Sequence, residues 1–255
     1  MTMTYAAVPA LKGDDALAKQ WTSGLASRVY DFGLRRPADK AGLLAAMAMT
    51  EKQGGSDVRA NVTSASPTSD HGEYRLHGRK WFTSAPMDDM FLMLPQAPDG
   101  LTCFVVPRVL PDGARNPLSI VRLKDKVGNR SNASAELELH DTVGTRLGDE
   151  GRGVRTIIEM VAATRLDCVL GSAALMRRAV AEASWHAAHR SAFGTTLAEQ
   201  PAMRNVLADL ATESEAATLL GLGWRPRSTA ATTTRSRYAG SACRWRSSGC
   251  ASAPR

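Results

Sequence analysis

The sequence predicts an α+β protein in which a middle antiparallel β domain is followed by part of a helical bundle. Three observations indicate this fold. Residues 58–140 contain apolar runs of strand length that are separated by turn residues, a pattern typical of an antiparallel barrel or sandwich. Residues 153–189 contain no proline and repeat apolar residues at helical spacing. Residues 201–220 continue with a second helical pattern.

The first part of the chain predicts two short helices. Residues 6–11 are the candidate end of one helix, and Asp14-Asp15 would begin the next, because acidic residues favour a helix N-terminus. The residues expected on one face of this second helix are Ala16, Leu17 and Trp21.

A small apolar segment, residues 38–49, then runs directly into a polar loop. Thr50 and Ser56 carry hydroxyl groups that can donate or accept hydrogen bonds. Gly54-Gly55 permits positive φ and the close approach of a ligand to the backbone. Because turn residues cluster in any loop, this stretch alone is equally well explained as the polar end of a helix.

The β region contains six runs of strand length. In the second run an alternating pattern reaches Gly78, where we expect a turn, and then come two aromatic and two hydroxyl residues, Trp81 to Ser84. A polar loop at residues 144–153 is expected to end the domain. The six runs are residues 58–65, 73–84, 90–94, 101–106, 118–127 and 133–140.

Two long helices are expected next. At about 1.5 Å per residue the pattern over residues 153–189 predicts a helix of roughly 50 Å. A loop at residues 191–199 leads to the second helix, with Pro201 in its first turn. Two such helices cannot bury both of their apolar faces against each other, so we expect partner helices that this sequence does not contain.

Composition excludes several classes of protein. No apolar run reaches the roughly 18 residues of a membrane span, and the N-terminus lacks a signal-peptide layout, so a cytoplasmic location is expected. The four cysteines form no Cys-x-x-Cys pair and the five histidines have no ligand spacing. We therefore expect neither a metal site nor a disulfide.

The positive net charge of +7 lies entirely in the last residues of the chain. Residues 223–255 hold seven of the arginines and no acidic residue, which leaves the rest of the chain with 25 basic and 25 acidic residues. This tail contains no Leu, Ile, Val, Phe or Met and cannot build a core. It is either a disordered basic tail that binds nucleic acid or an out-of-frame translation. We favour the second reading, because the helical pattern stops at Leu222 without a cap beyond glycine.

Three segments of the chain resemble motifs of the acyl-CoA dehydrogenase family. Residues 49–57, Met-Thr-Glu-Lys-Gln-Gly-Gly-Ser-Asp, are similar to its Met-Thr-Glu-x-x-x-Gly-Ser-Asp segment. Residues 78–84 resemble its Gly-x-Lys-x-Trp-Ile-Thr strand, and Arg190-Ser191-Ala192-Phe193-Gly194 with Gln200 resembles its Arg-x-x-Phe-Gly…Gln segment. One such motif would be weak, whereas three in register are specific.

The resemblance narrows to the DNA-alkylation-response (AidB-type) subgroup of these flavoproteins. Residues 49–61, 122–134 and 157–167 carry it, and it covers roughly residues 2–222. It implies four parts: the remnant of an N-terminal helical domain (1–44), a middle β domain (45–150), a partial C-terminal helical domain (151–222) and the tail (223–255). We therefore expect a fragment that is truncated at its N-terminus and frameshifted after about Leu222.

The resemblance implies FAD as the cofactor. The backbone of Met49 and the side chain of Thr50 would serve the pyrimidine edge of the flavin, where negative charge collects on reduction. Phe82 would pack on the ring system, and the Ser84 hydroxyl would meet N5, with Thr83 between them. Taken singly, Phe82 is better explained by core packing and Ser84 by a hydroxyl at a strand edge, and only the three segments in register overturn this.

Further contacts are implied outside the flavin ring. Ser56 falls where the family touches the cofactor or the acyl-CoA chain. Arg190, Phe193 and Gln200 would reach the FAD of a neighbouring subunit, because the intact family forms dimers or tetramers.

The family reaction is α,β-dehydrogenation of an acyl-CoA thioester, and it needs a carboxylate base. The usual base lies beyond the point where this chain departs from the family pattern. Some members place it just before an arginine that corresponds to Arg165, but that position is Thr164, and a threonine cannot be the base. Glu159 lies on the same predicted helix, one and a half turns away, and is the remaining candidate.

Three functions follow as competing hypotheses. The first is an acyl-CoA dehydrogenase-like oxidoreductase that binds FAD and lacks its catalytic base. The second is an alkylation-response flavoprotein that binds DNA rather than turning over acyl-CoA. The third is a helical interaction fragment without a ligand.

Overall fold

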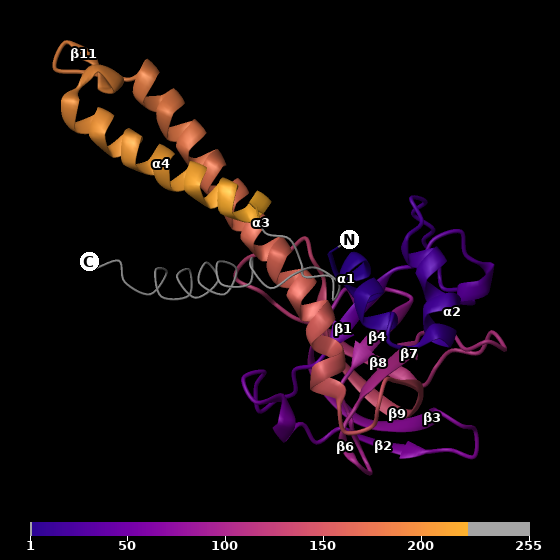
Figure 1. Ribbon diagram of the computed structural model, residues 1–255. Helices are drawn as coiled ribbons and strands as arrows, with labels where there is room; N and C mark the ends of the chain where they lie inside the picture. Colours follow the sequence, from indigo (N-terminus) through magenta and orange to yellow (C-terminus); the bar gives the residue numbers. More distant parts are fainter. Residues whose placement is uncertain (1, 224–255) are drawn as a thin grey trace. The chain divides into compact units, whose positions relative to one another are not determined.

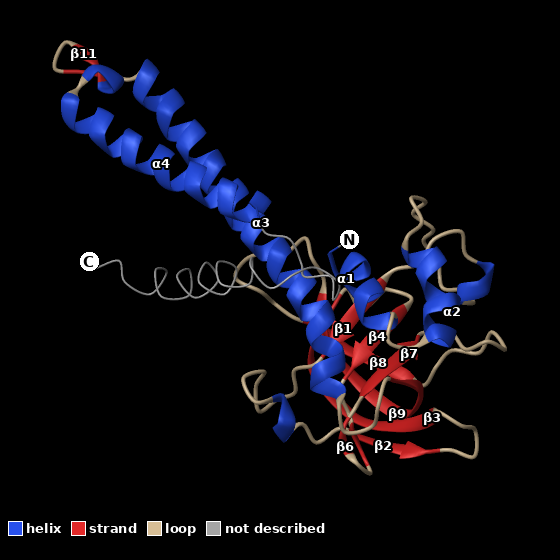
Figure 2. Ribbon diagram, viewed as in Figure 1, coloured by secondary structure: helices blue, strands red, loops and turns tan. Residues whose placement is uncertain are grey.

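The computed structural model describes residues 2–223, which form two compact units (Figure 1). The first unit extends to Thr164 and the second begins at Arg165, so the longest helix contributes to both. Figure 2 shows that the large sheet belongs to the first unit, whereas the second is helical apart from one short hairpin. The predicted tail, residues 223–255, lies outside the described residues except for Gly223.

The first unit combines short helices with a nine-stranded sheet. Its helices are α1 (Thr2–Leu11), α2 (Asp15–Leu25) and two 3-10 turns, η1 (Pro37–Asp39) and η2 (Val58–Ala60). Its strands are β1 (Ala45–Ala48), β2 (Ser64–Pro67), β3 (Glu73–Ser84), β4 (Met90–Met93), β5 (Gln96–Ala97), β6 (Gly100–Leu101), β7 (Cys103–Pro107), β8 (Leu118–Leu123) and β9 (Ser134–Leu147).

The sheet is mixed rather than wholly antiparallel. Its strand order is β1-β4-β7-β9-β3-β2-β5-β6, and β8 pairs with β9 beside this path. Most neighbours are antiparallel as predicted, but β1 pairs with β4 and β2 with β5 in parallel. Both parallel pairs are separated by long connections, which parallel strands require.

The centre of the sheet is buried on both faces, as β4 illustrates, whereas β8 is exposed along most of its length. Met90 and Leu92 contribute to a core with α1, α2 and the start of the long helix, whereas Phe91 and Met93 contribute to a second core with β3 and β9. A strand that is covered on both faces is apolar throughout, which explains why this run shows no alternation.

Helix α2 begins where the sequence predicts. The Asp14 side chain accepts a hydrogen bond from the backbone N–H of Leu17 at 3.0 Å and caps the helix. Leu17 and Trp21 are buried, but Ala16, which was expected beside them, is exposed.

Three local predictions differ from the structure. Residues 58–65 were expected as one strand, but Asp57 caps η2 by accepting from the Arg59 N–H, and β2 begins only at Ser64. The loop predicted at residues 144–153 starts later, because pairing with β7 extends β9 to Leu147. Gly78 makes no turn; β3 continues through it with a register shift, and φ there is +146°.

The second unit contains a helical hairpin. Helix α3 (Gly153–His189), predicted with the same bounds, enters it from the first unit. Strands β10 (Ser191–Ala192) and β11 (Thr195–Thr196) and the turn η3 (Leu197–Glu199) lead to α4 (Pro201–Gly223), which folds back along α3 (Figure 1). Large apolar side chains remain exposed on both helices, which agrees with the expectation that the pair cannot bury them alone: Leu175, Trp185, Leu219 and Leu222.

Candidate functional site

Two of the predicted cofactor segments meet at Thr50 and Phe82. These residues form an isolated antiparallel bridge. The carbonyl oxygen of Thr50 accepts hydrogen bonds from the backbone N–H groups of Trp81 at 2.8 Å and Phe82 at 3.5 Å. The loop after β1 is therefore joined to β3, although the two segments are far apart in the sequence.

A β-bulge aims Phe82 at the surface. Lys80 pairs with Leu137 and Thr83 with Ala135, so two residues of β3, Trp81 and Phe82, oppose a single residue of β9. Such bulges redirect side chains and occur often beside active sites. Phe82 is 45% exposed, so part of its apolar side chain is open to a ligand.

Unpartnered hydroxyl groups lie on either side of this ring in the sequence. Thr50 and Ser84 are both half-buried, and their side-chain oxygens have no hydrogen-bond partner within residues 2–223. Gly55 approaches closely, since a Cβ atom there would lie 2.9 Å from the Thr50 hydroxyl oxygen. Ser56, the next residue, is fully on the surface.

Met49 and Thr83 are placed differently from Thr50 and Ser84. The carbonyl oxygen of Met49 accepts from Nδ2 of Asn61 at 2.9 Å, which fixes the backbone immediately before Thr50. Thr83 is completely buried and its hydroxyl has no partner in the described chain. Its side chain thus belongs to the interior, whereas the neighbouring Phe82 ring belongs to the surface.

A buried ion pair supports both segments from behind. Lys80 Nζ lies 2.6 Å from Oε1 of Glu51, and both side chains are at most 2% exposed. Glu51 also accepts from the backbone N–H groups of Val62 and Thr63. Burial raises the pKa of Glu51, but the Lys80 charge and these hydrogen bonds outweigh it and leave the pKa below its usual value.

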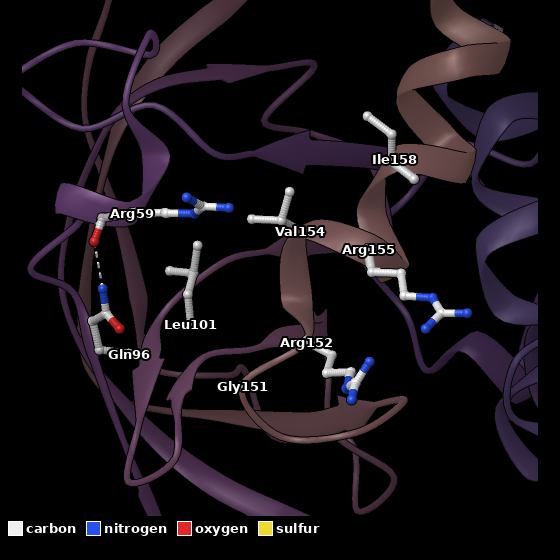
Figure 3. A pocket seen from close by; sticks show the side chains of 8 residues that line it. All are labelled: Arg59, Gln96, Leu101, Gly151, Arg152, Val154, Arg155 and Ile158. Carbon is white, nitrogen blue, oxygen red and sulfur yellow. Dashed lines mark hydrogen bonds between the residues drawn. The ribbon is translucent and has the colours of Figure 1, made fainter.

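An arginine-lined pocket of about 630 Å³ in the first unit was not predicted from the sequence (Figure 3). Its basic residues are Arg59, Arg152 and Arg155, and Figure 3 shows the Arg59 guanidinium reaching toward Val154. Within residues 2–223 no carboxylate forms an ion pair with any of the three. The pocket thus offers unneutralised positive charge beside apolar side chains and suits an anionic organic ligand.

A signal for this pocket was present in the sequence. Arg152 immediately precedes α3 and Arg155 lies in its first turn, and this turn contains no acidic residue. Positive charge is unfavourable at a helix N-terminus, where the helix dipole favours anions. Arginines at that position therefore indicate either a distant partner or a bound anion.

The residues considered for the catalytic base lie on α3. The Thr164 hydroxyl donates to the carbonyl oxygen of Val161 at 2.9 Å, a local helical contact. Glu159 is exposed and lines a neighbouring polar pocket of about 370 Å³ together with Asp149 and Arg155. Thr50, Phe82 and Ser84 do not line that pocket.

The remaining predicted residues gather at one turn of the second unit. Gln200 Nε2 donates to the carbonyl oxygen of Ala192 at 3.0 Å, and the Arg190 carbonyl accepts from the N–H of Leu197 at 2.8 Å. Phe193 is 99% exposed with φ +55°, in the left-handed region that a bulky residue rarely adopts. Arg190, Phe193 and Gln200 thus form a group of their own, separate from the six candidates in the first unit.

The described residues offer neither a metal-binding cluster nor a membrane-spanning helix. Within residues 2–223 no cluster of three His, Cys, Asp or Glu side chains is arranged to hold a metal ion. In the same part of the chain no helix combines the length and the apolar character needed to cross a bilayer.

Three family models match the chain. Residues 46–142 match the middle domain of acyl-CoA dehydrogenase, and residues 151–251 match its C-terminal domain. Residues 1–32 match the N-terminal domain of the adaptive response protein AidB. The C-terminal match extends past Leu222, where the resemblance in the sequence analysis ended.

Individual relatives are similar over most of the chain. The putative acyl-CoA dehydrogenase AidB of Escherichia coli is 52% identical over 221 residues, which are 86% of this chain and 41% of that protein. Acyl-CoA dehydrogenase family member 11 of Caenorhabditis elegans is 34% identical over 87% of this chain and 38% of its own length. The crystal structure of C. elegans ACDH-11 in complex with C11-CoA superposes with a TM-score of 0.73 at 33% identity, covering 87% of this chain and 40% of that one. The chain thus spans about two fifths of the length of these relatives.

Proposed function

Because the chain belongs to the acyl-CoA dehydrogenase family, we propose that it is the FAD-binding part of an oxidoreductase acting on the CH–CH group of acyl-CoA thioesters. FAD is the cofactor of this family, and it accepts hydride from the substrate when bound. The observation that carries the proposal is the bulge at Phe82, where Thr50 is bridged to the exposed Phe82 and the hydroxyls of Thr50 and Ser84 have no partner within residues 2–223.

The residues at the bulge fit a flavin. A flavin needs a flat apolar surface against its ring and hydrogen-bonding groups at its polar edge. Phe82 supplies the surface, and Thr50 and Ser84 supply hydroxyl groups that nothing else within residues 2–223 uses. Gly55 keeps the space beside the Thr50 hydroxyl open, since any side chain there would press against it.

The arginine-lined pocket supports an acyl-CoA ligand. The phosphate groups of coenzyme A are multiply charged, and arginine is well suited to bind phosphate through paired N–H donors. Arg59, Arg152 and Arg155 would bind these phosphates, and Leu101 and Val154 would contact the apolar parts of the thioester. The C. elegans relative in complex with C11-CoA supports the same class of ligand.

We further propose that this chain binds its ligands without dehydrogenating the thioester. Residue 164 is a threonine and not a carboxylate, and its hydroxyl already donates to the Val161 carbonyl. Glu159 lines a pocket with Arg155 rather than with Phe82. A proton on the α-carbon of a thioester beside the flavin would therefore meet no base from Thr164 or Glu159.

The group in the second unit supports a role in an assembly. Acyl-CoA dehydrogenases are oligomeric, and Arg190 and Phe193 are exposed on a turn that Gln200 holds. We propose that these three residues reach the FAD of a neighbouring subunit. The strained, fully exposed Phe193 is the observation that favours this role.

A second candidate function is DNA binding in the response to alkylation. The 52% identity with E. coli AidB and the seven arginines in residues 223–255 favour it. When a protein binds DNA phosphates, the logarithm of its binding constant falls linearly with the logarithm of the salt concentration. The test measures this slope for the chain with and without residues 224–255, and a slope that disappears with the tail would argue against a DNA site in the folded part.

The primary test is the visible absorbance of the purified chain, recorded before and after anaerobic addition of a panel of acyl-CoAs. The expected result is a flavin spectrum that shifts with acyl-CoA but does not bleach. Bleaching would contradict the absence of a base, and Glu159→Gln would then show whether Glu159 supplies it. Phe82→Ala is the variant that removes the proposed flavin contact. It suits this test because the exposed ring can be removed with little loss of core packing. A chain that binds no flavin under any condition would overturn the proposal.

A further inference from the structure

The bulge that presents Phe82 lies opposite an unusual carboxylate. Glu136, on β9, is the residue that Trp81 and Phe82 jointly oppose. Its side chain is completely buried, and carboxylates are rarely buried completely unless they are paired. Its position therefore ties it to the proposed flavin site.

Three cations surround this carboxylate. Lys124 Nζ lies 2.7 Å from Oε1 of Glu136, Arg122 Nε lies 2.6 Å from the same oxygen, and Arg79 Nη2 lies 2.6 Å from Oε2. One buried negative charge thus fixes three positive ones, and Glu138 lies 3.6 Å from the Arg79 guanidinium. The hydrogen bond from Lys124 is the largest contribution that lowers the pKa of Glu136 to about 2, so the carboxylate stays charged at neutral pH.

Lys124 differs from the two arginines in what else it touches. Its Nζ lies 3.2 Å from the ring centroid of Trp81 and 4.7 Å from that of Phe82. Its side chain is 9% exposed, whereas the side chains of Arg122 and Arg79 are 62% and 46% exposed. Arg122 lies over Trp81 alone, at 5.8 Å. Lys124 is therefore the desolvated cation that contacts the Phe82 ring.

We propose that Lys124 is a positioning residue of the flavin site, held by Glu136 so that it supports the Phe82 ring and keeps a fixed positive charge beside the flavin that packs on it. This inference rests on the proposed function. The ammonium interacts with the rings of both aromatic residues by cation–π contact, which restricts the orientation of Phe82. The charge also acts on the cofactor, because a desolvated cation interacts more strongly than one in water.

The charge has a predictable effect on flavin reduction. Uptake of two electrons and one proton converts neutral oxidised flavin into an anionic reduced form, so the ring system gains one negative charge. A fixed cation nearby binds the reduced form more tightly than the oxidised form. Lys124 is therefore expected to make the reduction potential of the bound flavin more positive.

The test measures the reduction potential of FAD bound to the full chain by titration with dithionite against a reference dye. Lys124→Met is expected to weaken the preference for reduced over oxidised flavin about tenfold, which corresponds to about 30 mV for a two-electron couple. Lys124→Arg is expected to keep the potential of the unmodified chain. Arg122→Met is the matched control, because it removes a charge from the same carboxylate without removing the contact with Phe82.

Each outcome bears on the inference. A potential that is unchanged in Lys124→Met, with FAD bound, would overturn the role of Lys124 and leave the proposed function intact. An equal change in Arg122→Met would also overturn it, because the effect would then be one of total charge. If Lys124→Met does not fold, Lys124→Gln, which keeps a donor toward Glu136, must give the same decrease. Failure of the unmodified chain to bind FAD would overturn the proposed function and this inference together.

Discussion

The carbonyl oxygen of Thr50 lies 2.8 Å from the backbone nitrogen of Trp81 and accepts its hydrogen bond. This contact joins the polar loop after β1 to the bulge of β3. The same oxygen also accepts from the N–H of Phe82. The backbones that carry the exposed Phe82 ring and the Thr50 hydroxyl are consequently held next to each other.

Gly55→Ala should disturb the site while leaving the fold intact. The new Cβ would lie 2.9 Å from the Thr50 hydroxyl oxygen, so Thr50 must turn away, and φ at Gly55 is not in the left-handed region. We expect FAD affinity to fall about tenfold, which is about 1.4 kcal/mol, and the free energy of unfolding to change little. Titration of the apo chain with FAD measures the first quantity. Gly128→Ala is the control, since a Cβ there meets nothing within 4 Å, and an equal loss in both variants would contradict the argument.

Breaking the Glu51–Lys80 ion pair should destabilise the first unit strongly. Lys80→Met leaves the Glu51 carboxylate buried without its counter-ion, as Glu51→Gln does for Lys80. Each change is expected to cost about 3–5 kcal/mol, and the double variant should cost less than the two together because the charges are coupled. Urea unfolding of the full chain gives these values.

An exposed ion pair provides the comparison for that experiment. Arg178 and Glu182 pair on the surface of α3, with side chains 76% and 58% exposed. Arg178→Gln should cost less than about 1 kcal/mol. Equal losses at the two places would mean that burial does not govern the strength of the Glu51–Lys80 pair.

Glu136 should make the stability of the fold depend on pH in the acid range. Its pKa is lowered from 4.5 to about 2, so the folded state favours the charged form. The resulting stabilisation is complete above pH 4.5 and is lost as the pH falls toward 2. We expect the stability difference between the unmodified chain and Glu136→Gln to be largest above pH 4.5 and to close below it. Thermal unfolding from pH 7 to pH 2.5 measures this difference, and a constant difference would refute the linkage.

Charge removal in the arginine-lined pocket should weaken binding of coenzyme A. Arg155→Gln is expected to raise the Kd for CoA about five- to tenfold, because a charge-assisted hydrogen bond contributes more than a neutral one. Higher salt should narrow the gap between variant and unmodified chain. Isothermal titration with CoA provides the measurement, and Arg178→Gln, an arginine already paired with Glu182, is the control. Equal Kd values for CoA in the two variants would mean that this pocket does not bind the phosphates of CoA.

The regular elements could largely be predicted from the sequence. The periodicity of residues 153–189 predicted α3 with its observed bounds, and the alternating run at residues 73–84 predicted β3. The residues Thr50, Phe82 and Ser84 became candidates only because their segments resemble motifs of the acyl-CoA dehydrogenase family. The helix and strand patterns are local, because hydrogen bonding and burial repeat with a fixed period along the chain.

The boundaries and pairings of several elements could not be predicted. Gly78 looks like a turn because glycine and its neighbours match a turn pattern, but β3 continues through it, and a Cβ there would lie 2.8 Å from the Cα of Thr63. The glycine therefore allows β3 to approach the backbone just before β2 closely. Likewise the extension of β9 to Leu147 depends on pairing with Cys103, a partner that is distant in sequence.

The sequence by itself determined the helical and strand periods, the polar loop after β1 and the family of the chain. Only the tertiary structure decided that Thr50 bonds to the bulge at Phe82 and that Lys124 lies against this ring. It also decided that Arg59, Arg152 and Arg155 line one pocket and have no acidic partner in the described part of the chain. The physical reason is that period and propensity act between neighbours along the chain. The site depends instead on which distant backbone groups and charges the sheet brings together, and on which of them it leaves unpaired.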